Sequence, residues 1–329
     1  MKAATCKGFG PQSSLTLADY PKPRMGSNDV MVEVYASSVN PKDWKLNTTI
    51  NKLIPTLGDT IHPLVLGDDL AGVVVDKGSN VSRFNVGDEV YGMTMHLRTG
   101  ALAEFAAIDQ DCIALKPSNI SFSEAASVPL AGLTALQALR LAEVKEGSKV
   151  LIIGASGGVG TFAVQIAKAL GAEVTGVCSG RNLQLVESLG ADNVIDYTQE
   201  NFTDRDDSFD AVFDATSYNS LAKCSSLMTE NGIFVSTLGH GKAIVDFALA
   251  QITHHKQKAK AVRVTPNTRD LETLCEYIEQ GKVKPQIDSQ YDLDEFEKAY
   301  ERSQTGHAAG KIVINIKTAA RAERPVAAA

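Results

Sequence analysis

Hydrophobic and polar positions follow two different patterns along the chain. From residue 1 to about 120, short apolar stretches are separated by turns that contain Pro, Gly, Asn or Asp. These stretches are Val30–Val34, Ala71–Val75, Glu89–Tyr91 and Leu102–Ile108. No helical period lies between them, so the pattern predicts a compact β unit such as a barrel.

Strands and helices alternate in the rest of the chain. Residues 121–141 are rich in Ala and Leu but are interrupted by Pro129 and Gly132, which predicts a broken helix at a domain junction. Helical stretches then separate five apolar strand candidates: Val150–Ile153, Glu173–Cys178, Asn193–Asp196, Phe209–Asp214 and Ile233–Thr237. This alternation predicts a parallel sheet that is covered by helices.

The C-terminal part mixes both patterns. Arg269–Gln280 has the apolar spacing of an amphipathic helix, and a second helix is predicted over Leu293–Ser303. Asp292 and Glu295 are spaced as a capping box for that second helix. A strand is predicted at Lys311–Ile316, and the aperiodic tail 318–329 is expected to fray.

A glycine-rich turn follows the first of the five strand candidates. Residues 154–160 read Gly-Ala-Ser-Gly-Gly-Val-Gly, and an apolar helical pattern runs from there to Gly171. Glycines let a backbone turn tightly and approach a pyrophosphate, while a helix N-terminus offers free N–H groups. The order of strand, glycine turn and helix therefore predicts a dinucleotide site at Ser156, Gly157, Gly158 and Val159. A plain left-handed turn is the alternative.

Composition narrows the class of protein. The chain has 329 residues, enough for two domains, with 44% hydrophobic and 22% charged residues. The net charge of −7 argues against a nucleic-acid partner, and five scattered cysteines suit neither a disulfide framework nor a zinc knuckle. No apolar run reaches transmembrane length, and the N-terminus lacks a signal-peptide core. A protein of a reducing compartment, without a membrane span and located in the cytoplasm, is expected.

Long motifs resemble the zinc-independent quinone oxidoreductase and enone reductase branch of the medium-chain dehydrogenase/reductase superfamily, especially chloroplast-envelope-type homologues. The resemblance covers residues 1–316, in order. Its motifs are VNPKDWK (39–45), PLVLGDDLAGVVVDKGSNVSRFNVGDEVYG (63–92), SVPLAGLTALQAL (127–139), GASGGVG (154–160), SLGADNVIDY (188–197) and GHAAGKIVI (306–314).

The resemblance implies an α/β fold with two domains. It predicts a GroES-like β domain over residues 1–120 and a Rossmann domain with a doubly wound parallel sheet over 121–265. Residues 266–317 would return to the first domain, ahead of the flexible tail 318–329. A homodimer is usual in similar proteins.

The cofactor is predicted to be NADPH. NAD-binding sheets usually place an acid at the end of the second strand, but here the strand ends in Ser179, Gly180 and Arg181. A guanidinium and a hydroxyl suit a 2′-phosphate, although Arg181 as a solvated side chain is the alternative. The resemblance places further residues at the cofactor: Thr134, Tyr197, Leu238, Gly239 and Lys311.

No metal is expected. In zinc-dependent relatives the first domain supplies a Cys ligand and a Gly-His-Glu motif, and these positions match Asn40, Asp68 and Asp69 here. Zinc favours thiolate and imidazole ligands, and no His lies near these positions in the sequence.

The catalytic residues are predicted on the segment that faces the nicotinamide in the resembled family. Asn40 and Lys45 are candidates to donate hydrogen bonds to an enone or quinone oxygen as hydride arrives. Tyr91 and Thr134 are candidates to touch the nicotinamide or the substrate. The alternative for Asn40 and Lys45 is a polar loop without a catalytic role. The alternative for Tyr91 and Thr134 is simple packing.

The function predicted from these residues is metal-independent, NADPH-dependent reduction of the C=C bond of α,β-unsaturated carbonyls or of quinones. A small-molecule enone or quinone is then the substrate. A carbonyl or alcohol dehydrogenase is one alternative, and a non-catalytic NADPH-binding redox sensor is another.

Overall fold

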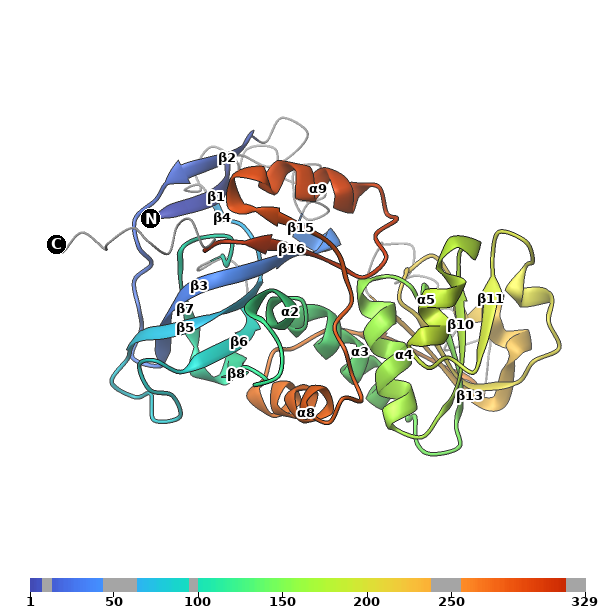
Figure 1. Cartoon of the computed structure of the whole chain (residues 1–329). Coiled ribbons are helices and arrows are strands. Elements are labelled where there is room, and N and C mark those ends of the chain that lie inside the picture. Colours follow the sequence, from blue (N-terminus) through green and yellow to red (C-terminus); the bar gives the residue numbers. More distant parts are fainter. Residues whose placement is uncertain (8–13, 44–63, 95–99, 238–255, 318–329) are drawn as a thin grey trace. The chain divides into compact units, whose positions relative to one another are not determined.

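The computed structural model describes residues 1–7, 14–43, 64–94, 100–237 and 256–317 (Figure 1). The chain separates into two compact units. Unit 1 comprises Met1–Leu130, Pro266–Cys275 and Ile287–Ala329, and unit 2 comprises Ala131–Thr265 and Glu276–Gln286. The predicted α/β fold is confirmed, because one unit is built on a mixed sheet and the other on a parallel one. The domain boundaries predicted from the sequence stay predictions.

A seven-stranded sheet forms the frame of unit 1. Its order is β15-β16-β3-β5-β6-β8, and β7 pairs with one end of β3. The pair β15–β16 is parallel and the other pairs are antiparallel. The strands are β3 (Asp29–Val39), β5 (Asp69–Lys77), β6 (Glu89–Met93), β7 (Phe105–Asp109), β8 (Ile113–Leu115), β15 (Ile287–Asp292) and β16 (Lys311–Asn315).

Unit 1 also holds an antiparallel sheet of three strands in the order β2-β1-β4. They are β1 (Lys2–Lys7), β2 (Ser14–Asp19) and β4 (Leu64–Val65). The sequence did not predict these strands, because β4 has only two residues and β1 and β2 carry few large apolar side chains.

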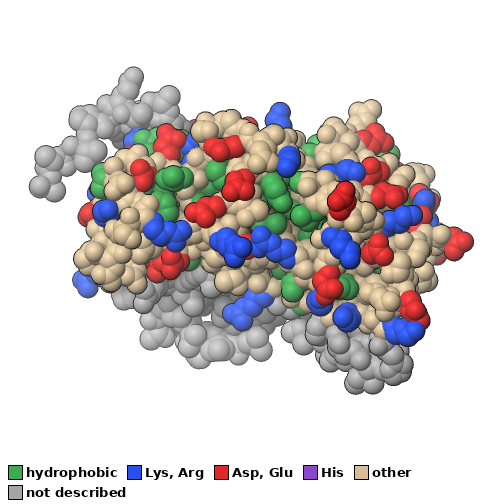
Figure 2. All heavy atoms as spheres, turned by 90° about the horizontal axis from the view of Figure 1, so that it is seen from below, with side chains coloured by type: hydrophobic (Ala, Val, Ile, Leu, Met, Phe, Trp, Pro, Cys, Tyr) green, Lys and Arg blue, Asp and Glu red, His purple; other side chains and the backbone are tan. Residues whose placement is uncertain are grey.

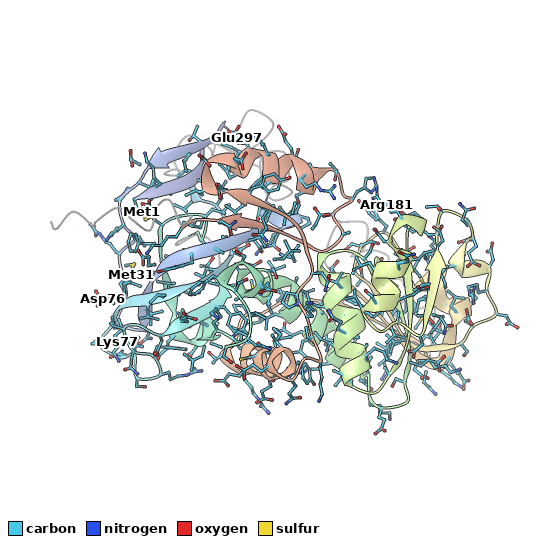
Figure 3. All side chains as sticks on the ribbon, in the orientation of Figure 1. Met1, Met31, Asp76, Lys77, Arg181 and Glu297 are labelled. Carbon is cyan, nitrogen blue, oxygen red and sulfur yellow. The ribbon has the colours of Figure 1, made fainter. Side chains whose placement is uncertain are left out.

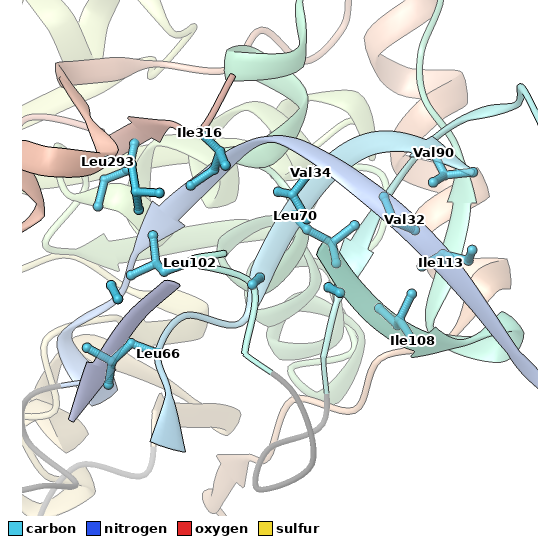
Figure 4. Packing of buried hydrophobic residues seen from close by; sticks show 14 of the residues in the cluster. Val32, Val34, Leu66, Leu70, Val90, Leu102, Ile108, Ile113, Leu293 and Ile316 are labelled. Atoms are coloured by element: carbon cyan, nitrogen blue, oxygen red, sulfur yellow. The ribbon is translucent and has the colours of Figure 1, made fainter. Parts of the chain in front are cut away.

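The burial of β3 explains where the core of unit 1 ends and its polar site begins. Side chains alternate between buried and half-buried from Asp29 to Ala36, and every side chain is buried from there to Val39. Val32 and Val34 pack with Leu70, Val90 and residues of the other strands in one apolar cluster (Figure 4). The fully buried end of β3 carries serines instead, which the core can hold only if they are hydrogen-bonded.

Helix α2 of unit 1 begins with a capping box that was not predicted from the sequence. In α2 (Phe122–Ala126), Ser121 accepts from the Glu124 N–H while the Glu124 carboxylate accepts from the Ser121 N–H. The other helical elements with residues in this unit are η1 (Gln110–Cys112), α8 (Thr268–Glu279), η5 (Leu293–Glu295) and α9 (Phe296–Gln304).

The capping box predicted at Asp292 and Glu295 is wrong. The Asp292 side chain makes no cap hydrogen bond, although the Glu295 carboxylate accepts from the Asp292 N–H. The first turn there is a 3-10 turn, η5, and α9 begins only at Phe296. A tighter turn changes the spacing on which a reciprocal box depends.

Unit 2 is built on a six-stranded sheet in the order β11-β10-β9-β12-β13-β14, and all its strand pairs are parallel. Numbered from β9, this order is 3-2-1-4-5-6, the doubly wound arrangement of dinucleotide-binding sheets. The predicted Rossmann sheet is confirmed. The strands are β9 (Lys149–Ile153), β10 (Glu173–Cys178), β11 (Asn193–Asp196), β12 (Phe209–Asp214), β13 (Met228–Thr237) and β14 (Lys258–Val262).

The helices of unit 2 place the glycine turn. Residues Gly160–Ala167 of α4 are all buried, so the helix packs against β9 and β10 from its third residue onward. The helical elements are α3 (Pro129–Leu141, from Ala131 in this unit), α4 (Gly158–Ala169), η2 (Gly180–Asn182), α5 (Leu183–Ser188), η3 (Phe202–Asp204), α6 (Leu221–Cys224) and η4 (Ser225–Leu227).

Basic and acidic side chains are interspersed over the face that Figure 2 shows. Among the residues that the structure describes, no helix is long and apolar enough to cross a membrane.

Candidate functional site

The glycine turn between β9 and α4 needs its first and last glycines for the fold itself. Gly154 has a φ of +82°, and a Cβ there would lie 2.6 Å from the Thr216 Cγ2. A Cβ at Gly160 would lie 2.0 Å from the Gly154 carbonyl oxygen. Helix α4 can therefore start this close to the end of β9 only without side chains at these positions.

Gly157 is different, because no described part of the protein requires a glycine there. Its φ of −79° suits any residue, and among the described residues a Cβ would meet only the Gly154 oxygen, at an ordinary 3.5 Å. Residues Ser156 to Val159 are half-buried, between the buried Ala155 and Gly160. The missing side chain thus keeps open the approach to the first-turn N–H groups of α4, which is the geometry that binds phosphate.

The end of β10 lies beside the end of β11. Cys178 pairs with Asp196 in the parallel register, so Ser179 and Tyr197 leave the sheet next to each other. Ser179 is half-buried, Arg181 is exposed, and Tyr197 is 53% exposed. Arg181 (labelled in Figure 3) lies in the short turn Gly180–Asn182 that precedes α5, and it makes no ion pair within the described ranges. The structure therefore presents a hydroxyl, a guanidinium and an aromatic ring at this edge.

Asp196 fixes the turn that carries Arg181. Its Oδ1 accepts from the Thr198 hydroxyl at 2.7 Å and from the Thr198 N–H at 2.9 Å, and its carboxylate also accepts from the Gly180 N–H. These hydrogen bonds lower the pKa of Asp196, so the carboxylate is ionised and held against the turn. A side chain at Gly180 would lie 2.4 Å from the Asp196 Oδ2. No pattern in the sequence indicates this role of Asp196.

Asn182 is a second residue that the sequence analysis missed. Its Nδ2 donates to the Ser156 Oγ at 3.0 Å and to the Ser179 Oγ at 3.4 Å. It therefore joins the predicted cofactor residues of the glycine turn to those at the end of β10. An asparagine three residues after Ser179 was the available signal, because Asn side chains bond local polar groups in such turns.

Another turn, at the carboxyl end of β12, packs against the glycine turn. The buried Asp214 carboxylate accepts from the Thr216 N–H at 2.9 Å and from the Asn219 N–H at 2.7 Å. Ser217 has a φ of +62°, and its hydroxyl donates to the Thr237 carbonyl oxygen at 2.7 Å. This network holds Thr216 against Gly154, on the side of the sheet where open α/β folds bind ligands.

Cys178, which ends β10, offers no reactive thiolate. Burial, helped by the Asp196 carboxylate, raises the pKa of its thiol to about 11. The thiol is therefore protonated at neutral pH, and it serves as an apolar floor for this edge of the sheet.

In unit 1, the structure brings Asn40 and Lys311 together around Asp69. All three are at least nine-tenths buried, and they lie where β3, β5 and β16 have adjacent ends. The Lys311 Nζ donates to the Asn40 Oδ1 at 2.5 Å and to the Asp69 Oδ2 at 3.3 Å, while the Asn40 Nδ2 donates to the same Asp69 oxygen at 2.9 Å. The Asn40 amide is thereby fixed at both ends.

Asp69 also accepts hydrogen bonds from a side-chain hydroxyl and from a backbone N–H group. The Ser38 hydroxyl donates to its Oδ2 at 2.5 Å, and the Leu130 N–H, in the first turn of α3, donates to its Oδ1 at 2.8 Å. The carboxylate that occupies a zinc-ligand position in the resembled enzymes is thus saturated by donors of this chain.

The charge of the neighbouring Asp68 is compensated as well, since its carboxylate lies 2.7 Å from the Lys42 Nζ. Burial and the Asp68 charge raise the pKa of Asp43 well above its usual range. Among the described residues, no three His, Cys, Asp or Glu side chains are grouped so that they can hold a metal ion. The donor set at these positions suits lysine ammonium groups.

Tyr91 and Thr134 are both buried. The Tyr91 hydroxyl donates to the Leu271 carbonyl oxygen at 2.5 Å, which matches the packed alternative for this residue. Thr134 is 5% exposed on α3. Lys45, Leu238 and Gly239 lie outside the described residues.

Comparison with known proteins agrees with both units. The alcohol dehydrogenase GroES-like domain family matches residues 26–118, and the zinc-binding dehydrogenase family matches residues 189–314. The chain is 36% identical over 316 residues to the chloroplast envelope quinone oxidoreductase homolog of Arabidopsis thaliana, covering 93% of this chain and 95% of that one.

Two further proteins with similar names resemble the chain over most of its length. The chain is 35% identical over 325 residues to the NADPH-dependent alkenal/one oxidoreductase, chloroplastic, of Arabidopsis thaliana, covering 95% of this chain and 79% of that one. The solved quinone oxidoreductase of Coxiella burnetii is 34% identical, with a TM-score of 0.88, over 96% of this chain and 99% of that chain.

A chain that combines a GroES-like domain with a Rossmann sheet is an oxidoreductase that uses a nicotinamide cofactor. The chain belongs to the quinone and enone oxidoreductase branch of the medium-chain dehydrogenase/reductase superfamily, as its motifs indicated.

The prediction of a cytoplasmic location is contradicted. It depended on the lack of a recognisable signal sequence. The two relatives from Arabidopsis thaliana are named as chloroplast proteins. A relative from Mus musculus is named as mitochondrial; it is 33% identical over 346 residues, which cover 94% of this chain and 85% of that one.

Proposed function

We propose that the chain reduces the C=C bond of α,β-unsaturated carbonyls, or reduces quinones, by hydride transfer from NADPH without a metal. The observation that carries the proposal is its similarity, over nearly the whole chain, to relatives named quinone oxidoreductase and alkenal/one oxidoreductase. The name of one relative includes NADPH dependence, and Ser179 with Arg181 at the end of β10 supports the same cofactor here.

The residues present fit this cofactor. Ser156, Gly157, Gly158 and Val159 would hold the pyrophosphate, and Ser179, Arg181 and Tyr197 would hold the adenosine with its 2′-phosphate. The bound nicotinamide supplies a hydride. The remaining assignments from the sequence, Thr134, Leu238, Gly239 and Lys311, stay predictions, as does the homodimer.

The protein's share of the reaction is to stabilise charge on the substrate. As the β-carbon of an enone gains a hydride, the π electrons move toward the carbonyl oxygen, and the α-carbon then takes a proton from water. Asn40 has a second Nδ2 hydrogen beyond the one it gives to Asp69, and the network with Lys311 fixes the plane of its amide. We assign this hydrogen to the developing oxyanion, with Lys45 as a second donor.

The same network supports the proposal that the reaction needs no metal. The carboxylates of Asp68 and Asp69 are compensated by Lys42 and Lys311, so a dication would have to displace an ammonium group. We therefore assign carbonyl polarisation to hydrogen-bond donors rather than to a Lewis acid.

The test follows the hydride. NADPH deuterated at C4 of the nicotinamide is turned over with a small enone, and the product is analysed by NMR. We expect deuterium at the β-carbon and a solvent-derived proton at the α-carbon. Deuterium at the carbonyl carbon would make the chain a carbonyl reductase, and a lack of turnover with enones and quinones alike would leave the redox-sensor alternative.

Replacing Arg181 by Ala is expected to weaken NADPH binding about ten- to a hundredfold, because it removes a charge-assisted contact of about 1.5–3 kcal/mol. NADH, which lacks the 2′-phosphate, should bind nearly as before. Both dissociation constants are measured by fluorescence titration. Arg205→Ala removes the same charge from an arginine of unit 2 that is paired with Asp207, and it serves as the control. An equal loss for both cofactors in Arg181→Ala would contradict the 2′-phosphate assignment.

A further inference from the structure

Asn182 stands at a helix start but does not cap the helix. Asparagine is a favoured N-cap because its side-chain oxygen can accept from the N–H groups of the first turn. As the N-cap of α5, Asn182 makes no such bond. Its amide is directed instead to the two serine hydroxyls at 3.0 and 3.4 Å.

These two contacts determine what the serines can do. A hydroxyl has one hydrogen to donate and two lone pairs that accept. Since the Asn182 Nδ2 donates to both oxygens, the hydrogens of Ser156 and Ser179 are left to point elsewhere. Within the part of the chain that the structure describes, neither hydroxyl donates a hydrogen bond.

The two serines lie at two different places where negative charge is expected. Ser156 directly precedes Gly157, the N-cap of the twelve-residue helix α4. Ser179 follows β10, at the position where sheets that bind NAD place an acid for the ribose. Both side chains are half-buried, so each retains an exposed side toward a ligand.

The geometry points to Asn182 as a positioning residue that sets both serines as hydroxyl donors to phosphate oxygens. Ser156 serves the pyrophosphate, and Ser179 serves the 2′-phosphate. The inference rests on the proposed function, because it concerns the same nucleotide. It adds that specificity for the 2′-phosphate depends on a residue that itself has no contact with the nucleotide.

The experiment is a set of nucleotide titrations on the full chain. Dissociation constants for NADPH and NADH are measured by fluorescence for the wild type, Asn182→Ala, Ser156→Ala, Ser179→Ala and the two double variants that contain Asn182→Ala. Asn201→Ala is the matched control, because Asn201 accepts from the Thr203 N–H at the start of η3, a local capping role in the same unit. Thermal unfolding of each variant verifies that it is folded.

We expect Asn182→Ala to weaken NADPH about tenfold and NADH about threefold, since two oriented hydrogen bonds to phosphate are loosened for the first and one for the second. In the Ser179→Ala background, Asn182→Ala should weaken NADPH no more than NADH. In the Ser156→Ala background, it should leave NADH unchanged. Asn201→Ala should leave both constants at the wild-type value.

Asn182→Asp provides a test with a larger expected effect. A carboxylate only accepts, so both serine hydrogens should turn toward it and away from the phosphates, and NADPH should weaken more than in Asn182→Ala. The inference is overturned if Asn182→Ala binds like Asn201→Ala, or if its effects simply add to those of the serine variants.

The wild type separates this inference from the proposed cofactor. A wild type that binds NADPH and NADH equally would overturn the NADPH assignment. The NADH dissociation constants of the Ser156→Ala variants, with and without Asn182→Ala, would still test the role of Asn182. A wild type that binds neither nucleotide would overturn both.

Discussion

Replacing Asp69 by Ala is expected to lower the free energy of unfolding by about 3–5 kcal/mol, the cost of breaking a buried ion pair by removing one partner. Asp69 is completely buried and accepts from Ser38, Asn40, Lys311 and the Leu130 N–H. Without it, the Lys311 ammonium group stays buried, and its partners among the described residues are only the neutral oxygens of Asn40 and Val39. Urea denaturation followed by circular dichroism measures the loss.

Asp76 gives the matched control, since it lies on the same strand, β5, but at the exposed end (Figure 3). Asp76→Ala should change the free energy of unfolding by no more than about 0.5 kcal/mol. The double variant Asp69→Leu/Lys311→Met should lose much less than the sum of its single variants, because apolar groups can replace a buried ion pair. A loss in Asp69→Ala as small as in Asp76→Ala would contradict the role of this network.

The Rossmann sheet was predictable because its signal is local and repeated. Apolar strands such as Val150–Ile153 alternate with helical periods, and the glycine turn marks the first crossover. Strand β15 shows what local patterns miss. Its sequence, IDSQYD, is mostly polar and nowhere fully buried, and it forms a strand because it pairs with β16 at the edge of the sheet. Such pairing is a property of the fold, and the sequence of the segment alone does not show it.

The candidate site also has a part that the sequence predicts and a part that it does not. Ser156, Gly157, Ser179 and Arg181 could be placed at one edge because the carboxyl ends of adjacent parallel strands meet there. The direction of the Asn182 side chain could not be predicted, since it depends on two turns that are brought together by the sheet.

Lys311 shows which contacts the sequence leaves open. Its assignment to the cofactor stays a prediction, and its ammonium group lies in the buried network of Asn40 and Asp69. The reason is register: Ile312 pairs with Val39, and Ser38 pairs with Asp69, so the ends of three strands converge. No sequence spacing reveals this convergence, because the lysine is 271 positions from Asn40.

The glycine turn allows the fold and the nucleotide site to be tested separately. Gly160→Ala is expected to lower the free energy of unfolding by about 3 kcal/mol, because its Cβ would lie 2.0 Å from the Gly154 oxygen, a backbone atom that cannot move aside without displacing α4 from β9. Gly157→Ala should leave stability within about 0.5 kcal/mol of the wild type, since its φ of −79° is ordinary and its Cβ has room.

For nucleotide binding, the change at the unstrained position is the informative one. The Gly157→Ala methyl group would stand in front of the first-turn N–H groups of α4 and hold the pyrophosphate away from them, so we expect NADPH and NADH to weaken equally, about ten- to a hundredfold. This equal loss distinguishes it from Arg181→Ala, which affects only the cofactor with a 2′-phosphate. Titration of both cofactors, beside thermal unfolding, measures the two effects. If Gly157→Ala binds both nucleotides like the wild type, the pyrophosphate does not approach this turn, and the glycine there has no function that the structure explains.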